Sequence, residues 1–262
     1  MARRATAIKD IRGQNPNVLL LDAGNALTGQ SLADGSKGRV VVEAMNQLGY
    51  TAMAIGEREL CLGLAEFRKR MQEARFPFVS ANVVIKATGK LLAEPYAIVE
   101  VGGIKVGILG LTNANAVQIP LANMSTGLAW PSFADEVIVT DPLVAAEQYV
   151  PEIAAKADLV IVLSHLGIDL DQTLVAEVPG IAVVVGGYSR TILSTPLAQR
   201  GALIVQAGYD GEYLGKLVLE IGESGSIAKH AGEIIALGPK FLDDPQMAQW
   251  LAEAKRSATS AP

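Results

Sequence analysis

Polar side chains follow several apolar stretches of this sequence, at points where a ligand could bind. The apolar stretch 18–21 runs through Asp22 and a glycine turn to Asn25. A buried strand that ends in such a turn commonly delivers an oxygen ligand to a metal at the carboxyl edge of a sheet. The amide of Asn25 is a weaker metal ligand than a carboxylate. This turn therefore predicts a ligand position with reduced affinity for metal.

Three further turns carry charged or aromatic side chains. Each follows an apolar run, and they are Gly56-Glu57-Arg58-Glu59, Ser164-His165-Leu166-Gly167 and Gly186-Gly187-Tyr188-Ser189-Arg190-Thr191. Arginine stays charged and forms paired hydrogen bonds with phosphate or carboxylate groups. Arg58, His165 and Arg190 could therefore form a metal-free pocket for a small anion. The competing interpretation is a filled remnant site, in which Arg58 pairs with Glu57, Glu59 or another carboxylate and Arg190 is solvated.

The histidine content limits the metal chemistry that these turns could support. The chain has two histidines, His165 and His230. Two-metal phosphoester cleavage uses both ions to generate hydroxide and to hold the transition-state charge, and one imidazole with an amide and Glu57 cannot hold two such ions. We therefore expect no metal centre and no other cofactor. His165 is expected as a hydrogen-bonded histidine at a strand end, with weak binding of a single metal as the alternative, and His230 is expected on the surface.

Alternating strand and helix patterns must position these turns. Strands are predicted at 17–22, 51–55, 77–81, 159–163 and 181–185. Helices are predicted from the start to Gly13, at 37–48, at 63–75, from the Asp141-Pro142 cap, and from the Asp244-Pro245 cap to about Lys255. This alternation is typical of a mainly parallel sheet with helices on its faces.

The remaining patterns add antiparallel pieces and a loop. The runs 96–101 and 104–111 flank Gly102-Gly103 and predict a hairpin. Residues 202–206, 214–221 and 226–236 are predicted to close the sheet, and 112–140, with Pro120, Pro131 and Ser132, to form a long surface loop. The predicted fold class is α/β, a four-layer α/β/β/α sandwich with mixed sheets.

Composition narrows the classes of partner. The net charge of −5 and the pI near 5.2 argue against nucleic acid or an anionic membrane, because both require a basic face. No stretch approaches the roughly 20 apolar residues of a membrane span, and the start lacks the apolar run of a secretory signal. The single cysteine, Cys61, is expected to be a half-buried structural residue. Nucleotide-binding glycine loops and a serine-hydrolase elbow are absent from the sequence.

Seven ordered segments resemble one protein family. The four turns above, together with 77–83, 106–112 and 204–215, resemble the catalytic domain of the 5'-nucleotidase and UDP-sugar hydrolase branch of the calcineurin-like metallophosphatases. The resemblance runs from residue 2 to about residue 256. It implies a metallophosphatase-like domain over 1–256, followed by a linker stub at 257–262, without the carboxyl-terminal domain that fixes substrate choice in the family.

The resemblance also implies a two-metal centre whose ligands are largely replaced here. An aspartate and a histidine belong to a first strand that the chain does not contain. The Gly-Asp that should bridge the metals is Gly24-Asn25, and the Gly-Asn-His-Glu motif is Gly56-Glu57-Arg58-Glu59. Asp22 precedes the ligand position by three residues and is expected to be structural.

The other motifs are replaced in the same way. Cys61 stands where an aspartate orients the catalytic histidine, and Tyr188 and Arg190 stand where the family has Gly-His-x-His. Among the ligand positions, His165 matches the family. Without the first strand a sheet edge is left unpaired, which suggests docking of another protein chain.

The resemblance and the replaced ligands leave two candidate functions. The favoured one is a degenerate, catalytically inactive domain that acts as a binding or assembly module, with a small anion as a candidate ligand. The alternative is a metal-dependent phosphoester hydrolase of nucleotide catabolism, which would need two divalent metals such as manganese, zinc or magnesium. By resemblance, the expected location is the periplasm or the cell surface.

Overall fold

The structure, a computed structural model, describes residues 1–118, 121–124, 126–130, 133–222 and 225–259. Its largest sheet has six strands in the order β10-β11-β9-β8-β6-β5. These strands are β5 (Tyr96–Val101), β6 (Ile104–Thr112), β8 (Leu159–His165), β9 (Val183–Gly186), β10 (Leu197–Gln199) and β11 (Ala202–Gln206). The inner pairs are parallel and the outer strands β5 and β10 are antiparallel to their neighbours. Strand β8 is buried along its whole length, as expected for a strand covered on both faces.

A second, three-stranded parallel sheet faces the first. It consists of β1 (Leu21–Asp22), β2 (Ala52–Ala54) and β3 (Phe78–Val79), in that order. Two further two-stranded sheets are β4 (Val83–Ile85) with β7 (Val137–Val139), and β12 (Tyr213–Ile221) with β13 (Ile227–Ala236).

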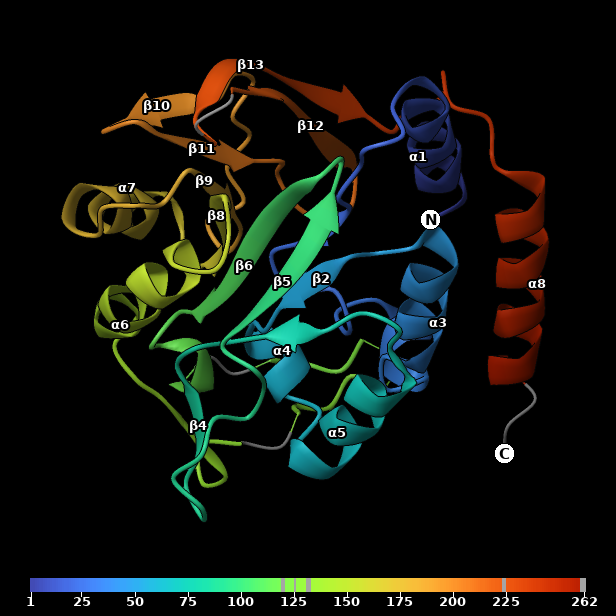
Figure 1. The fold of residues 1–262 in the computed structure, drawn as a ribbon. Helices are drawn as coiled ribbons and strands as arrows, with labels where there is room; N and C mark the ends of the chain where they lie inside the picture. The colour runs from blue at the N-terminus through green and yellow to red at the C-terminus, as the bar shows by residue number, and fades with distance from the viewer. Residues whose placement is uncertain (119–120, 125, 131–132, 223–224, 260–262) are drawn as a thin grey trace.

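Helices cover the outer faces of the two main sheets. Figure 1 shows α6 (Pro142–Ala154) and α7 (Ile168–Glu177) beside the six-stranded sheet, and α3 (Arg39–Leu48) and α5 (Leu64–Glu73) on the side of β2. Helices α1 (Ala2–Gln14) and α8 (Pro245–Thr259) pack against each other. The short elements are α2 (Ser31–Gly35), α4 (Glu57–Leu60) and the 3-10 turn η1 (Ala116–Gln118).

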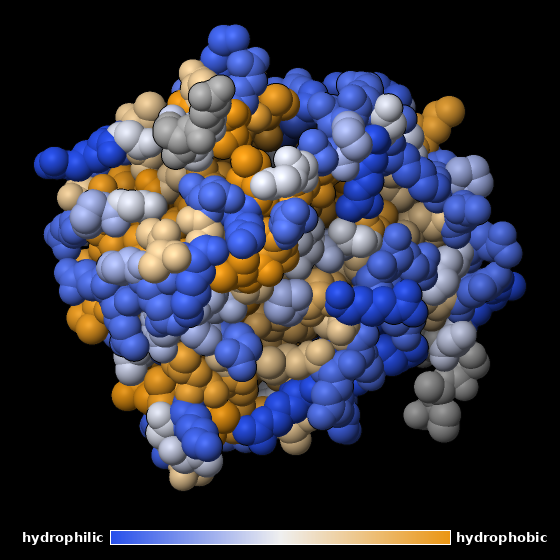
Figure 2. Space-filling view, viewed as in Figure 1, coloured by the Kyte–Doolittle hydropathy of each residue, from blue (hydrophilic) through white to orange (hydrophobic). Residues whose placement is uncertain are grey.

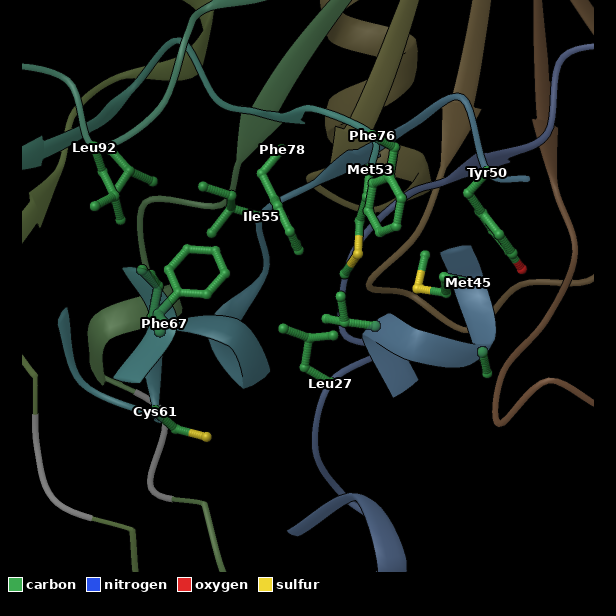
Figure 3. Close-up of a cluster of buried hydrophobic side chains, with 14 of the residues drawn as sticks. Leu27, Met45, Tyr50, Met53, Ile55, Cys61, Phe67, Phe76, Phe78 and Leu92 are labelled. Carbon is green, nitrogen blue, oxygen red and sulfur yellow. The ribbon is translucent and has the colours of Figure 1, made fainter. Parts of the chain in front are cut away.

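Three apolar clusters separate the four layers. One lies between the two sheets and joins Ala54 and Val79 to Ile108 and Ile161. A second packs the six-stranded sheet against α6 and α7. The third packs the three-stranded sheet against a layer of helices that includes α3 and α5. It contains Phe67 and Phe78, whose rings meet edge to face with their centres 5.1 Å apart (Figure 3). The predicted α/β/β/α sandwich is therefore confirmed.

Several local predictions are also confirmed. Strands β5 and β6 form the predicted hairpin, with Gly102 and Gly103 both at positive φ, as a tight two-residue turn requires. The Asp141 side chain caps α6 by accepting the Leu143 N–H at 2.8 Å, and Asp244 caps α8 by accepting the Met247 N–H at 2.9 Å.

Other local predictions are wrong. Residues 214–221 and 226–236 do not close the main sheet, because β12 and β13 pair with each other in a separate ladder. The expected loop at 112–140 contains η1 and β7, and β7 pairs antiparallel with β4. Residues 119–120, 125 and 131–132 of that loop, which include Pro120, Pro131 and Ser132, lie outside the described residues.

Some elements near the site have no counterpart among the predicted ones. Helices α2, α4 and α7 and strand β10 were not predicted, and α8 continues to Thr259, beyond the expected end near Lys255. Residues 260–262 of the predicted linker stub lie outside the described part of the chain. Within the described ranges, none of the helices has both the length and the apolar character needed to cross a membrane.

Candidate functional site

The candidate residues lie at the ends of strands from both main sheets. Asn25 follows β1, and Glu57 and Arg58 open α4 directly after β2. His165 is the last residue of β8, and the turn with Tyr188 follows β9. Because the carboxyl ends of parallel strands share one edge of a sheet, turns that are far apart in the sequence meet there.

Glu57 joins three of these turns. Its Oε2 lies 2.8 Å from Nε2 of His165, and its Oε1 accepts a hydrogen bond from the Asn25 amide at 2.5 Å. The amide oxygen of Asn25 in turn accepts the backbone N–H of Arg58 at 3.0 Å. Asn25, Glu57, Arg58 and His165 therefore satisfy one another through direct hydrogen bonds.

His165 is enclosed and uses both ring nitrogens. It is 1% exposed, and its Nδ1 lies 2.7 Å from the backbone oxygen of Ala23. Burial opposes the positive charge, but the hydrogen bond and the charge of Glu57 outweigh it and raise the pKa of His165. In the same way, burial disfavours the Glu57 carboxylate, and the contact with His165 still lowers the pKa of Glu57. Both shifts in pKa favour an imidazolium that donates to the Glu57 carboxylate and to the backbone oxygen of Ala23.

Close packing leaves little free space around this pair. A Cβ atom on Gly56 would lie 2.2 Å from Oδ1 of Asn25 and 2.9 Å from Nε2 of His165. A Cβ atom on Gly187 would lie 3.1 Å from Nδ1 of His165. Glycine is required at these positions because the turns approach the imidazole so closely.

Glu59 holds the turn after β1 in place. Its carboxylate is fully buried and accepts four backbone N–H groups, from Asn25, Ala26, Leu27 and Gly56, at 2.8–3.0 Å. The sequence predicts for Glu59 only a role as a partner of Arg58. The spacing Gly-x-x-Glu at the start of a helix was the signal that could have identified it, since a glutamate at the third helical position commonly accepts the N–H of the capping residue.

Arg58 does not pair with the neighbouring glutamates. Among the described residues its guanidinium makes no ion pair within 4.0 Å, and Glu57 and Glu59 are occupied by the partners named above. The guanidinium lies against Gly29, where a Cβ atom would be 2.0 Å from Nη1. The alternative pairing of Arg58 with Glu57, Glu59 or another carboxylate is therefore not found among the described residues.

Tyr188 and Arg190 lie on the outer side of the site. The Tyr188 ring meets His165 edge-on, with ring centres 5.6 Å apart and an angle of 81°. Arg190 is exposed and its guanidinium carbon lies 5.5 Å from the centre of the Tyr209 ring. Asn25, Tyr188 and Arg190 all have positive φ values, between 58° and 66°. Such backbone geometry is uncommon for tyrosine and arginine, and it tends to occur at functional turns.

One cavity of about 1150 Å³ brings the two arginines into a common space. Its lining includes Arg58, Arg190, Tyr188, Asn25 and His165. Arg58, His165 and Arg190, the three residues of the predicted anion pocket, therefore line one cavity, but both ring nitrogens of His165 are already engaged. Arg58 and Arg190 supply the donors that remain.

The remaining candidate residues lie in the apolar core, in a turn or on the surface. Cys61 is 1% exposed, so it is fully buried rather than half-buried as expected. It lies in the apolar cluster of Figure 3, and burial raises the pKa of its thiol to about 12. Its Sγ donates to the backbone oxygen of Arg58 at 3.1 Å. Asp22 accepts the N–H of Gly24 at 3.0 Å and so closes the turn that leads to Asn25. His230 lies exposed on β13, as predicted.

A buried carboxylate near the site was missed. Ser164 donates a hydrogen bond to Oδ1 of Asp171 in α7, while Oδ2 has no partner among the described residues. Asp171 is fully buried, and burial raises its pKa to about 7. The sequence offered no signal for this contact, because an aspartate in the first turn of a helix is usually exposed to solvent.

Comparisons with known proteins agree with this architecture. No family model matches the chain. The 5'-nucleotidase of Bos taurus is 35% identical over 272 residues, which cover 94% of this chain and 45% of the bovine protein. The crystal structure of a 5'-nucleotidase precursor from Thermus thermophilus superposes with a TM-score of 0.86 at 30% identity, over 99% of this chain and 53% of that one. The calcineurin-like phosphoesterase YfkN of Bacillus subtilis has a TM-score of 0.81 at 23% identity, over 98% of this chain and 89% of that one.

The fold and the position of the site define a metallophosphatase-like domain. The chain belongs to the 5'-nucleotidase family within the calcineurin-like metallophosphatases. It spans about half the length of the curated relatives it matches.

Proposed function

We propose that this domain is a catalytically inactive relative of the 5'-nucleotidases that binds a small anion without metal and serves as a binding or assembly module. One observation carries the proposal. Arg58 and Arg190 line the same cavity, and neither guanidinium makes an ion pair within the described part of the chain. Two cations that face one cavity without a carboxylate partner favour an anionic ligand.

The donor set supports a metal-free site. Glu57 and His165 are the carboxylate and imidazole at the remnant ligand positions, and they are hydrogen-bonded to each other. A metal would have to break this contact and displace the Asn25 amide from Glu57. Arg58 and Arg190 add two permanent positive charges to the cavity, which disfavour a nearby divalent cation. These residues do not fit a dinuclear centre, and no catalytic step is assigned to one.

The chemistry of the cavity favours oxyanions. A guanidinium presents parallel N–H donors that match two oxygens of a phosphate, sulfate or carboxylate. Tyr188 and Tyr209 also line the cavity. Their uncharged rings could contact an uncharged group attached to the anion. Glu57 contributes no competing charge because His165 neutralises it. We therefore propose that the ligand class is a small phosphate, sulfate or carboxylate compound.

Anion binding can be tested by calorimetry in the presence of EDTA, with inorganic phosphate as the titrant. Arg58→Ala and Arg190→Ala should each weaken binding by about tenfold, since a charge-assisted hydrogen bond contributes roughly 1.5–3 kcal/mol. Arg68→Ala is the matched control, because Arg68 is exposed on α5 and does not line the cavity. Equal binding by all four proteins would contradict the arginine pocket, as would the absence of any heat of binding.

The alternative function is a metal-dependent phosphoester hydrolase acting on nucleotides. It is supported by the names of the relatives, 5'-nucleotidase in each of the first matches. Phosphate binding that requires manganese and disappears with EDTA would favour this alternative over ours. We further expect the protein to act in the periplasm or at the cell surface, which fractionation of cells that produce it would test.

A further inference from the structure

Strand β5 forms one edge of the six-stranded sheet. It pairs with β6 on one side, and in the described part of the chain no strand pairs with its other side. Figure 1 shows β5 at the front of the view, and Figure 2 shows apolar side chains that reach the surface among hydrophilic ones on this face. Ile98, in the middle of β5, is 40% exposed. An apolar side chain on an unpaired edge makes β5 a candidate interaction surface.

The hydrogen bonds of the β5–β6 hairpin show which backbone groups of β5 face outward. The oxygen of Pro95, just before the strand, accepts the Gly110 N–H of β6 at 3.1 Å. Successive residues of an antiparallel strand direct their N–H and C=O groups to opposite sides. The backbone groups of Tyr96, Ile98 and Glu100 therefore point away from β6. Among the residues that the structure describes, none of these groups has a hydrogen-bond partner.

The side chains of these three residues share one face of the sheet, because side chains alternate along a strand. Tyr96 packs against the apolar cluster beneath α6. Its hydroxyl donates to Glu152 of α6 at 2.7 Å and accepts from Lys156 of α6 at 2.7 Å. The Lys156 ammonium uses two of its three donors in this way, on Tyr96 and Glu152. Glu100, at the other end of the strand, is exposed.

From this geometry we infer that β5 pairs with β5 of a second copy of this chain, in an antiparallel, twofold-symmetric arrangement. The outward-facing groups of all three residues in each copy find partners only when Ile98 lies opposite Ile98 of the second copy. Tyr96 then lies opposite Glu100 of the second copy, at both ends of the pair. This register brings Glu100 of one copy toward the third donor of Lys156 in the other. Backbone and side-chain groups therefore agree on one register, which favours a second copy over an unrelated peptide.

The sequence of β5 contains little that would prevent such pairing. Strands that avoid edge-to-edge contact usually carry a proline, a bulge or charged side chains. Strand β5 has no proline and no bulge over its six residues, and its one charge, on Glu100, meets a counter-charge in the proposed pair. The pair names a partner for the assembly role proposed above. It does not rest on the anion site, which lies at the ends of β2, β8 and β9.

Sedimentation of the full chain in the analytical ultracentrifuge, without phosphate, tests the pair. We expect a monomer–dimer equilibrium, and Ile98→Lys should raise its dissociation constant at least about tenfold, because two ammonium groups would lie opposite each other at the twofold axis. Leu170→Lys is the matched control, since Leu170 is 38% exposed on α7, which packs against β9, β10 and β11 at the opposite side of the sheet. Ile98→Lys should bind phosphate as the wild type does, so the dimer and the anion site can fail separately.

Amide hydrogen exchange followed by NMR gives a second readout that does not depend on a variant. The amides of Tyr96, Ile98 and Glu100 should exchange more slowly as the protein concentration rises. The amides of Val99 and Val101, which face β6, should not change. A protein that stays monomeric at its highest soluble concentration would overturn the inference. A dimer that Ile98→Lys does not weaken, or one that protects only other segments, would also overturn it.

Discussion

Glu57 and His165, 108 residues apart in the sequence, form a buried ion pair with Oε2 and Nε2 2.8 Å apart. The two residues belong to turns from different sheets, so the contact ties the sheets together at the edge where ligands would bind. It also occupies both ring nitrogens of His165, together with Ala23, and one carboxylate oxygen of Glu57. Under the proposed function, this pair takes the place of a metal in closing the site.

The pair predicts a pH-dependent contribution to stability. Glu57 and its contacts raise the pKa of His165, so the contribution from His165 is complete below its unfolded pKa near 6.5 and is lost as pH rises through the higher folded value. The pKa of Glu57 is lowered, so its contribution is complete above its unfolded pKa and is lost as pH falls through the folded value. The stabilisation should therefore be largest at mildly acidic pH.

Urea denaturation of the Glu57→Gln variant, across the pH range in which His165 and Glu57 titrate, measures this contribution to stability. We expect a loss of about 3 kcal/mol near pH 6, as for other buried pairs that lose one partner, and smaller losses at both pH extremes. Glu152→Gln is the control, because Glu152 pairs with Lys156 at the surface and the variant should leave stability nearly unchanged at every pH. A loss of equal size at every pH would contradict the ion pair.

Asn25→Asp should destabilise the protein, although a carboxylate is a stronger metal ligand than an amide. The Asn25 amide donates to Glu57, so a carboxylate would replace a hydrogen bond by repulsion between two acceptors. We expect a loss of about 2–3 kcal/mol, which lowers the melting temperature by several degrees. Asn17→Asp, at an exposed position, should have little effect. Recovery of the Asn25→Asp variant above the wild type on addition of manganese would contradict a closed, metal-free site.

Asp171 should make the protein less stable as pH rises. Burial raises its pKa to about 7, so the folded state prefers the protonated form, and stability falls between the unfolded pKa near 3.8 and about 7. The full effect would be roughly 4 kcal/mol. In Asp171→Asn this part of the pH dependence should disappear, which thermal denaturation at pH 5 and pH 8 would measure. An unchanged pH profile would show that Asp171 does not titrate in this range.

Cys61 should be unreactive in the folded protein. It is 1% exposed, and burial raises the pKa of its thiol to about 12, so little thiolate exists at neutral pH. A thiol reagent such as Ellman's reagent should label it only after unfolding in guanidinium chloride. Rapid labelling of the native protein would place Cys61 in an accessible site rather than in the apolar cluster.

Much of the fold could be predicted because its signals are local. Gly102-Gly103 specifies a tight turn through backbone conformation, and Asp141 and Asp244 cap helices within three residues of themselves. The long apolar run of β8 reflects burial on both faces. The partners of β7 and β12 could not be predicted in this way, because pairing depends on packing between segments that are distant in the sequence.

The site could be predicted in part for the same reason. Strand-end turns identified Asn25, Glu57, His165 and Arg190, because each follows an apolar run. The sequence did not show that Glu57 would pair with His165 rather than with its neighbour Arg58, since that choice depends on how two sheets are placed. It also did not show that Glu59 would hold the turn after β1.

The central claim is that this site holds no dinuclear metal centre. The most direct test is metal content by elemental analysis of the full chain after dialysis against manganese and zinc, with hydrolysis of an aryl phosphate measured on the same sample. Our account predicts far less than one equivalent of metal and no turnover. Two equivalents of metal together with turnover would contradict it, and would show that Glu57 and His165 separate to act as ligands.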